Sequence, residues 1–259
     1  MQCNFSTDNL TSCFPSYLDD LENLPDVNGL ITGKADDSIR RRALNEYYKD
    51  KMATAIHEAG HIVAMLLLSE NPESMYYAYI SCKMIPISED SIIAYSGWHG
   101  AVNYNPIYLK KVDQVMENVL NTSGMNAEIE FGFSTVNAYL GAAKDLEDAT
   151  EIAKENTKRI GGVDKSLSWS RQKNEYRAYM KQEENILSLY TKVIIQENYD
   201  AIIPFANALY EQGSLTQDKI KEIASRTTLH FDAFNNLKCY ITEFYSKPAS
   251  THKKKRKHS

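Results

Sequence analysis

The strongest hydrophobic pattern in this chain is helical and covers residues 53–69. The polar segment 40–48 leads into this run as helix, and Asn71-Pro72 ends it, because the residue before a proline is disfavoured in the α conformation. A surface helix would not be this apolar, so the pattern predicts a helix buried in the core. The apolar side chains that recur at helical spacing are Ile56, Ile62, Val63, Leu66 and Leu67.

Strand patterns follow this helix, and helical patterns fill the rest of the chain. Segments 75–87 and 91–104 are rich in tyrosine, isoleucine and serine, and they predict a small antiparallel sheet. Asn105-Pro106 supplies a cap and a first-turn proline for one helix, and Pro204 is expected to open another. The sequence therefore predicts a mainly α fold with a small antiparallel β-sheet and a helical C-terminal part. Helices are predicted at 107–120, ended near Gly124, and at 125–131, 145–160, 175–198, 205–212 and 216–225.

Length and composition fit one ordinary globular domain. The chain has 259 residues, of which 43% are hydrophobic and 24% are charged. We predict a partly disordered N-terminal arm at 1–38, the domain itself at 39–245 and a disordered basic tail at 246–259. No run approaches the roughly 20 apolar residues of a membrane span, and the N-terminus lacks the pattern of a signal peptide. We therefore expect no transmembrane segment.

The charge and the cysteine content of the chain indicate which binding partners and which cellular compartment to expect. The net charge is −5, and the tail Lys253–Lys257 contributes five positive charges, so the rest of the chain carries −10. An acidic body argues against nucleic-acid binding. The tail resembles a short nuclear localisation signal, and it also fits a solvated basic end. Because the four cysteines show no C-x-x-C spacing, we expect reduced thiols and a cytoplasmic protein, with a nuclear location open through the tail.

The apolar helix carries an H-E-x-x-H motif, His57-Glu58-Ala59-Gly60-His61. Because positions i and i+4 share one helix face, both imidazoles can bind one Zn²⁺. Glu58 then projects beside the place of a metal-bound water, as in zinc peptidases. A tetrahedral catalytic site also needs a third protein ligand. A histidine six residues after the motif is excluded, because Leu67 stands there, and the best candidate segment is 141–153.

This later segment and three others resemble one known family. Asp145, Leu146 and the run from Ala149 to Ala153 match an N-D-L-x-x-A-T-x-I-A pattern, and Gly124–Glu128 is similar to a G-R-A-A-E segment. Residues 196–216 are similar to the family's closing helices. With the H-E-A-G-H motif, these segments resemble the peptidase domain of the FtsH-type ATP-dependent zinc metalloproteases over about residues 41–224.

The resemblance implies a single zincin-like metallopeptidase domain with Zn²⁺ as its cofactor. It implies His57, His61 and Asp145 as the metal ligands and Glu58 as the general base. The expected activity is hydrolysis of peptide bonds in unstructured or loop segments of a protein or peptide substrate. The family normally carries an ATPase module and membrane helices, and this sequence shows neither, so we expect a zinc endopeptidase without its own ATPase. A separate ATPase partner and a homo-oligomer both stay open.

Several alternatives remain at this point. The chain could be a catalytically weak pseudo-protease or adaptor that binds a partner ATPase or a client protein, or an interaction module without metal; an intact Glu58 argues against the adaptor. Asp145 could instead be an acidic residue favoured by the helix dipole. Glu128 could support a ligand, pack, or replace Asp145 as a ligand. His99 could contact substrate or be incidental. By analogy with the family, the strand near 97–102 could align an extended peptide.

Overall fold

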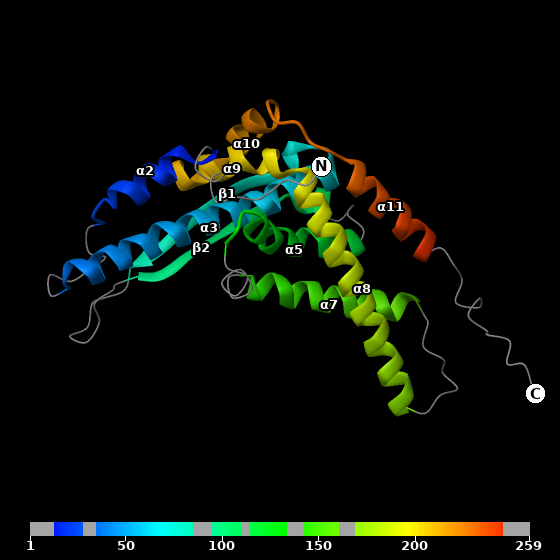
Figure 1. Cartoon of the computed structure of the whole chain (residues 1–259). Coiled ribbons are helices and arrows are strands. Elements are labelled where there is room, and N and C mark those ends of the chain that lie inside the picture. Colours follow the sequence, from blue (N-terminus) through cyan, green and yellow to red (C-terminus); the bar gives the residue numbers. More distant parts are fainter. Residues whose placement is uncertain are drawn as a thin grey trace, which may run out of the picture.

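The computed structural model describes residues 13–27, 35–84, 95–109, 114–133, 142–160 and 169–245. Helices dominate this part of the chain, and its strands form one small antiparallel sheet, so the predicted mainly α fold is confirmed (Figure 1). The predicted basic tail lies outside the described residues. The elements are α2 (Pro15–Asn23), α3 (Asp37–Ser69), the 3₁₀ turn η1 (Pro72–Ser74), β1 (Met75–Met84), β2 (Tyr95–Tyr104), α4 (Pro106–Leu109), α5 (Gln114–Glu130), α7 (Ala143–Ile160), α8 (Trp169–Glu197), α9 (Tyr199–Gln212), β3 (Ser214–Thr216), α10 (Gln217–Ala224) and α11 (Asp232–Tyr245).

Helix α3 is the centre of the fold, and the predicted polar lead-in and apolar run form one continuous helix of 33 residues. It begins where the Asp36 side chain accepts a hydrogen bond from the Ile39 N–H. It ends at Glu70, which adopts the left-handed conformation with φ 52° just before Asn71-Pro72. Every side chain from 55 to 67 is buried, because α5, α9 and the sheet pack around this half of the helix (Figure 1).

The same helix passes a length-and-composition test for crossing a membrane, as the one helix in the described part of the chain that does so. However, 78% of its most apolar window is buried inside the protein. A helix that is apolar all round and covered by other elements is the pattern of a core helix.

The sheet has the order β2-β1-β3 and is antiparallel throughout. Ala78 of β1 pairs with Val102 of β2 on one side and with Leu215 of β3 on the other. The third strand was not predicted, because three residues are too few to show an alternating pattern. Within the described residues β2 is an edge strand, and it packs along α3. The predicted strand ends at 85–87 and 91–94 lie outside the described residues.

Helix α5 corrects the prediction that a helix ends near Gly124 and a new one starts at 125. The helix runs unbroken from Gln114 to Glu130. The glycines serve close packing instead: a Cβ added to Gly60 on α3 would lie 2.8 Å from both Ala127 Cβ and the Ser123 carbonyl oxygen on α5. The predicted helix start at Asn105-Pro106 belongs to the short helix α4, and residues 110–113 lie outside the described part.

The C-terminal half corrects two further predictions. Helix α9 begins at Tyr199, six residues before the predicted helix 205–212, and Pro204 lies inside it. Proline removes one backbone hydrogen bond, but Phe205 and Leu209 are fully buried, and this packing against α3 keeps the helix continuous. Helix α11 was not predicted, although Phe234 and Leu237 anchor it in the core. Helices α7 and α10 lie close to their predicted positions, whereas α8 begins at Trp169, six residues before its predicted start at 175.

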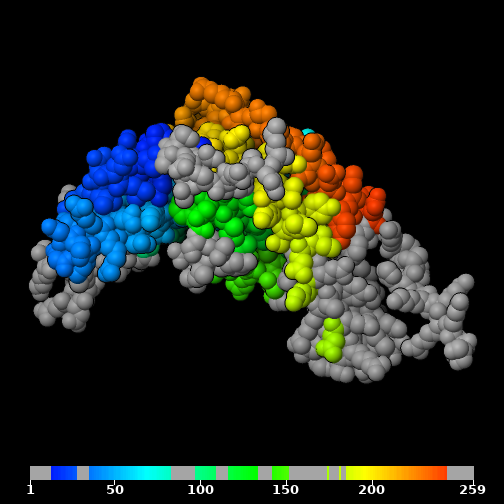
Figure 2. Space-filling model, in the orientation of Figure 1, coloured from blue at the N-terminus to red at the C-terminus, as the bar shows by residue number. Residues whose placement is uncertain are grey.

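The first and last described helices lie at opposite ends of the described part of the molecule (Figure 1). Helix α2 and the first half of α3 form one end of the face seen in Figures 1 and 2, and α11 forms the other. Phe14 and Tyr17 are both buried: Phe14 packs against Phe131, and Tyr17 contacts Tyr210 of α9 in a T-shaped, edge-to-face arrangement. The segment predicted as an N-terminal arm therefore contributes to the core at these positions.

Candidate metal centre

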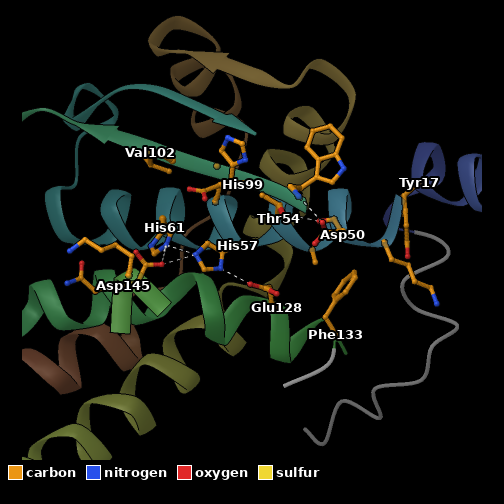
Figure 3. Close-up of a pocket in the computed structure, with 18 of the residues that line it drawn as sticks. Tyr17, Asp50, Thr54, His57, His61, His99, Val102, Glu128, Phe133 and Asp145 are labelled. Atoms are coloured by element: carbon orange, nitrogen blue, oxygen red, sulfur yellow. Dashed lines mark hydrogen bonds and ion pairs between the residues drawn. The ribbon is translucent and has the colours of Figure 1, made fainter. Parts of the chain in front are cut away.

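Three side chains from two distant helices converge at one point. His57 and His61 lie one turn apart on α3, both are buried, and their Nε2 atoms are 3.0 Å apart. Asp145 comes from the first turn of α7, and its Oδ2 lies 3.0 Å from His57 Nε2 and 3.3 Å from His61 Nε2. Figure 3 shows the two imidazoles and this carboxylate pointing toward one another. They form a group that could hold a metal ion.

The spacing of these three atoms fits a small divalent cation. With zinc–ligand bonds of about 2.0–2.1 Å, the ligand atoms of a tetrahedral site are separated by roughly 3.3–3.4 Å. The observed separations of 3.0–3.3 Å come close to these edges. Two imidazole nitrogens and one carboxylate oxygen are also a donor set that zinc accepts in catalytic sites, where a fourth position stays open. The residues present therefore fit a zinc ion.

Groups behind the imidazoles fix their orientation. The Leu120 carbonyl oxygen lies 2.8 Å from His61 Nδ1, and a carbonyl can only accept, so this nitrogen carries the hydrogen and donates it. The Glu128 carboxylate lies 2.7 Å from His57 Nδ1. With both Nδ1 atoms engaged, the Nε2 lone pairs of the neutral rings face the shared point. Of the roles considered for Glu128, the structure gives it the support of His57, on the side away from Asp145.

The electrostatics of the centre favour a positive charge. Burial lowers the pKa of His57, but hydrogen bonds to Asp145 and Glu128 outweigh this effect and raise it to about 10. Burial would raise the pKa of Asp145, yet hydrogen bonds from His57 and His61 hold that pKa well below its usual value. Carboxylates on both sides thus favour a cation between them, whether a proton or a metal ion.

Glu58 lies next to this point and is 5% exposed. Strand β2 packs directly against it, since a Cβ added to Gly100 would lie 2.6 Å from Glu58 Cγ and 2.7 Å from its Oε1. Burial raises the pKa of Glu58, Asp145 and Glu128 raise it further, and His61 and His57 oppose them. A carboxylate with a raised pKa beside a candidate metal is suited to accept and return a proton near neutral pH.

The centre opens into a cleft of about 1040 Å³ between α3, β2, α5 and α7. From the histidines the cleft extends along α3 toward Tyr17 of α2 (Figure 3). His99 lines it but stays apart from the three converging side chains; it is exposed on β2, with its Nε2 2.9 Å from the Ser81 hydroxyl. Further lining residues are Glu46, Asp50, Thr54, Trp98, Val102, Tyr104, Asn121, Phe133, Lys144 and Asp148.

Two residues have a place in this site that the sequence reasoning did not foresee: Gly124, which it had read as a helix end and as part of the G-R-A-A-E-like segment, and Tyr104. A Cβ added to Gly124 would lie 2.5 Å from His57 Nε2 and 2.7 Å from His61 Nε2, so only glycine leaves this space empty. Its helical surroundings were the available signal, because a glycine inside a helix needs a packing reason. Tyr104 lines the cleft beside the histidines. No sequence signal distinguished it from the chain's other sixteen tyrosines.

No protein-family model matches this chain. Among curated proteins, the chain is similar to a protein named ATP-dependent zinc metalloprotease FtsH from Caldicellulosiruptor bescii. The two are 27% identical over 201 residues, a match that covers 68% of this chain and 30% of the relative. The chain therefore spans less than a third of the length of the relative it matches. This weak similarity suggests a distant relationship to the FtsH proteases and, with the His-His-Asp group, a zinc metalloprotease.

Proposed function

We propose that this chain is a zinc-dependent endopeptidase that hydrolyses peptide bonds in extended segments of protein substrates. The observation that carries the proposal is the convergence of His57, His61 and Asp145 within 3.3 Å of one another, with the buried Glu58 beside them. The similarity to an FtsH protease supports the same chemistry. His57, His61 and Asp145 would hold the ion.

In this proposal Glu58 moves the proton. A zinc ion bound here would supply Lewis acidity to the scissile carbonyl and to the attacking water. Glu58 accepts the proton that the water gives up as its oxygen bonds to the carbonyl carbon, and returns it to the nitrogen of the leaving amine. Its raised pKa suits both transfers. Glu128 and the Leu120 carbonyl keep the two imidazoles oriented through these steps.

Within the described residues no strand pairs with the edge of β2 that faces away from β1, and this open edge is suited to hold an extended peptide. The Ile80 N–H donates to the Gly213 carbonyl, on the β3 side of the sheet, so in the Ile80–Gly100 pair the backbone groups of Gly100 face away from β1. Trp98 follows the same alternation, and its N–H donates outward to Asp50 Oδ2 at 2.8 Å. Gly100 and Val102 therefore present N–H and C=O groups at the open edge, beside Glu58, for strand addition.

Replacing Glu58 by glutamine tests the proposal. The amide cannot accept a proton, so the variant is expected to bind as much zinc as the wild type and to hydrolyse substrates about 10²–10⁴-fold more slowly. The measurement is zinc content by metal analysis, together with cleavage of casein and of short peptides. Glu70→Gln, just beyond the end of α3 and exposed, is the matched control and should behave like wild type.

Three outcomes separate the alternatives. Near wild-type turnover by Glu58→Gln would reject the mechanism. A wild-type chain purified without chelator that holds no stoichiometric zinc would reject the metal site. A wild-type chain that holds zinc but cleaves neither casein nor peptides, with or without ATP, would favour the adaptor or a requirement for a separate ATPase partner.

A further inference from the structure

Tyr104 lies in the candidate active-site cleft, where nothing so far gives it a role. It is the last residue of β2 and shares the sequence alternation of Gly100 and Val102, which places all three side chains on the same face of the strand. Gly100 on that face touches Glu58. The Tyr104 ring packs against the hydrophobic core and lines the cleft that also contains Glu58 and Asp145.

The Tyr104 hydroxyl has no protein partner within the described part of the chain. No hydrogen bond joins it to another described residue, whereas Tyr48, Tyr108 and Tyr210 each place their hydroxyl in one. Among buried side-chain nitrogen and oxygen atoms of the described residues, Trp98 Nε1 is the one without a partner. A fully buried Tyr104 hydroxyl without a partner would be a second such atom, so the Tyr104 hydroxyl is in contact with solvent. Because Tyr104 lines the cleft, that solvent is the water of the cleft.

The surroundings keep this phenol protonated, so that it can act only as a donor toward a carbonyl oxygen. Burial raises the pKa of Tyr104 well above its usual value, and the carboxylates of Glu58 and Asp145 raise it further.

Most other donors in the cleft are engaged, buried or distant. The Trp98 indole N–H has no partner but is buried, and the exposed Lys49 lies eight residues before His57 on α3. The Thr54 hydroxyl donates to the Asp50 carbonyl, and the Lys144 ammonium donates to Asp148 at 2.6 Å. The His99 ring is paired with Ser81. Tyr17 lies at the far end of the cleft from His61 (Figure 3). No hydrogen bond joins the Asn121 amide to another described residue, but Asn121 belongs to α5 and not to the strand that would hold a peptide.

We propose that Tyr104 is a catalytic residue whose phenol O–H donates a hydrogen bond to the scissile carbonyl oxygen as that oxygen gains negative charge. The inference rests on the proposed peptidase function. The O–H bond stays intact throughout: the water oxygen bonds to the carbonyl carbon, the C–N bond breaks, and the proton released by the water reaches the amine nitrogen through Glu58. Tyr104 thus stabilises the transition state without exchanging a proton.

Tyr104→Phe is the test, because it removes the hydroxyl and keeps the ring that packs in the core. Removal of one donor of this kind typically lowers kcat by about 10²–10³-fold. Since a bound zinc would share the charge, we expect kcat to fall by at least about tenfold, with KM changed less than about twofold. Zinc content and Tm should match the wild type. Tyr79→Phe, which removes a hydroxyl from a β1 tyrosine that does not line the cleft, is the control.

Binding of a peptide phosphonate supplies a readout that does not depend on turnover. A phosphonate mimics the charged tetrahedral oxygen, so Tyr104→Phe should weaken its binding by a factor close to the loss in kcat/KM, while binding of the product peptide stays unchanged. A kcat within twofold of wild type, or a loss that comes with lowered zinc content or Tm, would overturn the role. If wild-type protein with bound zinc hydrolyses nothing and Glu58→Gln changes nothing, the proposed function itself fails, and the role of Tyr104 fails with it.

Discussion

Each histidine of the candidate centre uses both of its ring nitrogens. The Nε2 atoms meet Asp145, and the Nδ1 atoms are held from behind by Glu128 and by the Leu120 carbonyl. Ser123 adds a hydroxyl 3.1 Å from His61 Nδ1. An imidazole held at one nitrogen cannot rotate its other nitrogen out of place, so affinity for a metal should depend on residues that do not bind the ion.

Truncation of Glu128 tests this dependence. Glu128→Ala removes the carboxylate that holds His57, and loss of such a partner typically costs about 10–100-fold in metal affinity. Glu128→Gln keeps an oxygen that can accept the Nδ1 hydrogen, so its zinc affinity should lie between those of the wild type and Glu128→Ala. Competition with a chelator of known zinc affinity measures the effect. Wild-type affinity in Glu128→Ala would contradict the role.

The first-turn aspartate of α7 gives a matched pair of variants. Asp145→Asn should lose zinc strongly, because an amide oxygen is a poorer ligand than the carboxylate that lies 3.0–3.3 Å from both imidazoles. Asp148→Asn, one turn later on the same helix, removes only a partner of Lys144, so this variant should keep its zinc. Equal zinc affinity in the two variants, measured by the same chelator competition, would place the third ligand elsewhere.

Sequence reasoning reached some of these residues and could not reach others. The pairing of His57 and His61 follows from helix geometry alone, since i and i+4 share a face. Asp145 lies 84 residues beyond His61, and only a resemblance to known proteins singled it out. The support from Glu128 depends on how α5 packs on α3, which no local pattern encodes. Tyr104 required the register of β2.

At the scale of elements, glycines let the helices of the site approach one another. Gly60 on α3 and Gly124 on α5 face each other, and an added Cβ on Gly60 would lie 3.2 Å from Gly124 Cα. The close approach brings the Ser123 and Leu120 groups of α5 within reach of His61. Gly100 does the same for β2 and Glu58. Glycine at positions 60, 124 and 100 therefore allows the close approach of α3 to α5 and of β2 to Glu58.

Gly124→Ala tests whether glycine is needed for this close packing, because the packing determines whether the variant is more or less stable than the wild type. In an ordinary helix interior the change stabilises by about 0.5–1 kcal/mol. Here the new methyl group would lie within 2.7 Å of both Nε2 atoms, so we expect lower Tm and loss of zinc binding. Thermal melting and metal analysis check both, with Asn121→Ala on the same helix as the control. Higher Tm with full zinc binding would refute the packing argument.

The elements that sequence missed share a cause, which is that tertiary packing decided them. Strand β3 has three residues and forms because Ala78 and Tyr79 of β1 offer partners. Pro204 stays helical because the buried side chains around it hold α9 against α3. Gly124 continues a helix that its local propensity would end. The long apolar run of α3 was the most predictable element, since its pattern and its burial agree.

At the scale of the whole molecule, the candidate centre joins two parts of the fold. Helix α3 belongs to the large core, whereas α7 rests on a smaller hydrophobic cluster of Met125 and Ala142, with Ile129 and Leu146 beside them. The backbone of α7 is also held where the Asn118 side chain donates to the Ala149 carbonyl. Helix α7 also packs on α5 and α8, and an ion shared by α3 and α7 would add a link from α7 to the helix at the centre of the core.

Chelation should consequently lower stability in a way that depends on Asp145. At free zinc one hundred times its Kd, binding stabilises the folded state by about 2.7 kcal/mol. For a chain of this size that corresponds to a rise in Tm of roughly 5–10 °C. Thermal melting with and without chelator measures it, and Asp145→Ala should show no shift. Hydrogen exchange should accelerate in α7 more than in α3, and equal acceleration in both would contradict the linkage.

Helix α3 supplies both the spine of the core and the floor of the cleft. Many enzymes carry their reactive groups on loops, which can drift in sequence and loosen without cost to the scaffold. Here His57, Glu58 and His61 sit on a helix whose thirteen consecutive residues from 55 to 67 are buried. Substitutions that adapt this site to cold or to new substrates are therefore expected in β2, α5 and α7, which form the walls of the cleft. Substitutions in α3 are limited by the packing of the core.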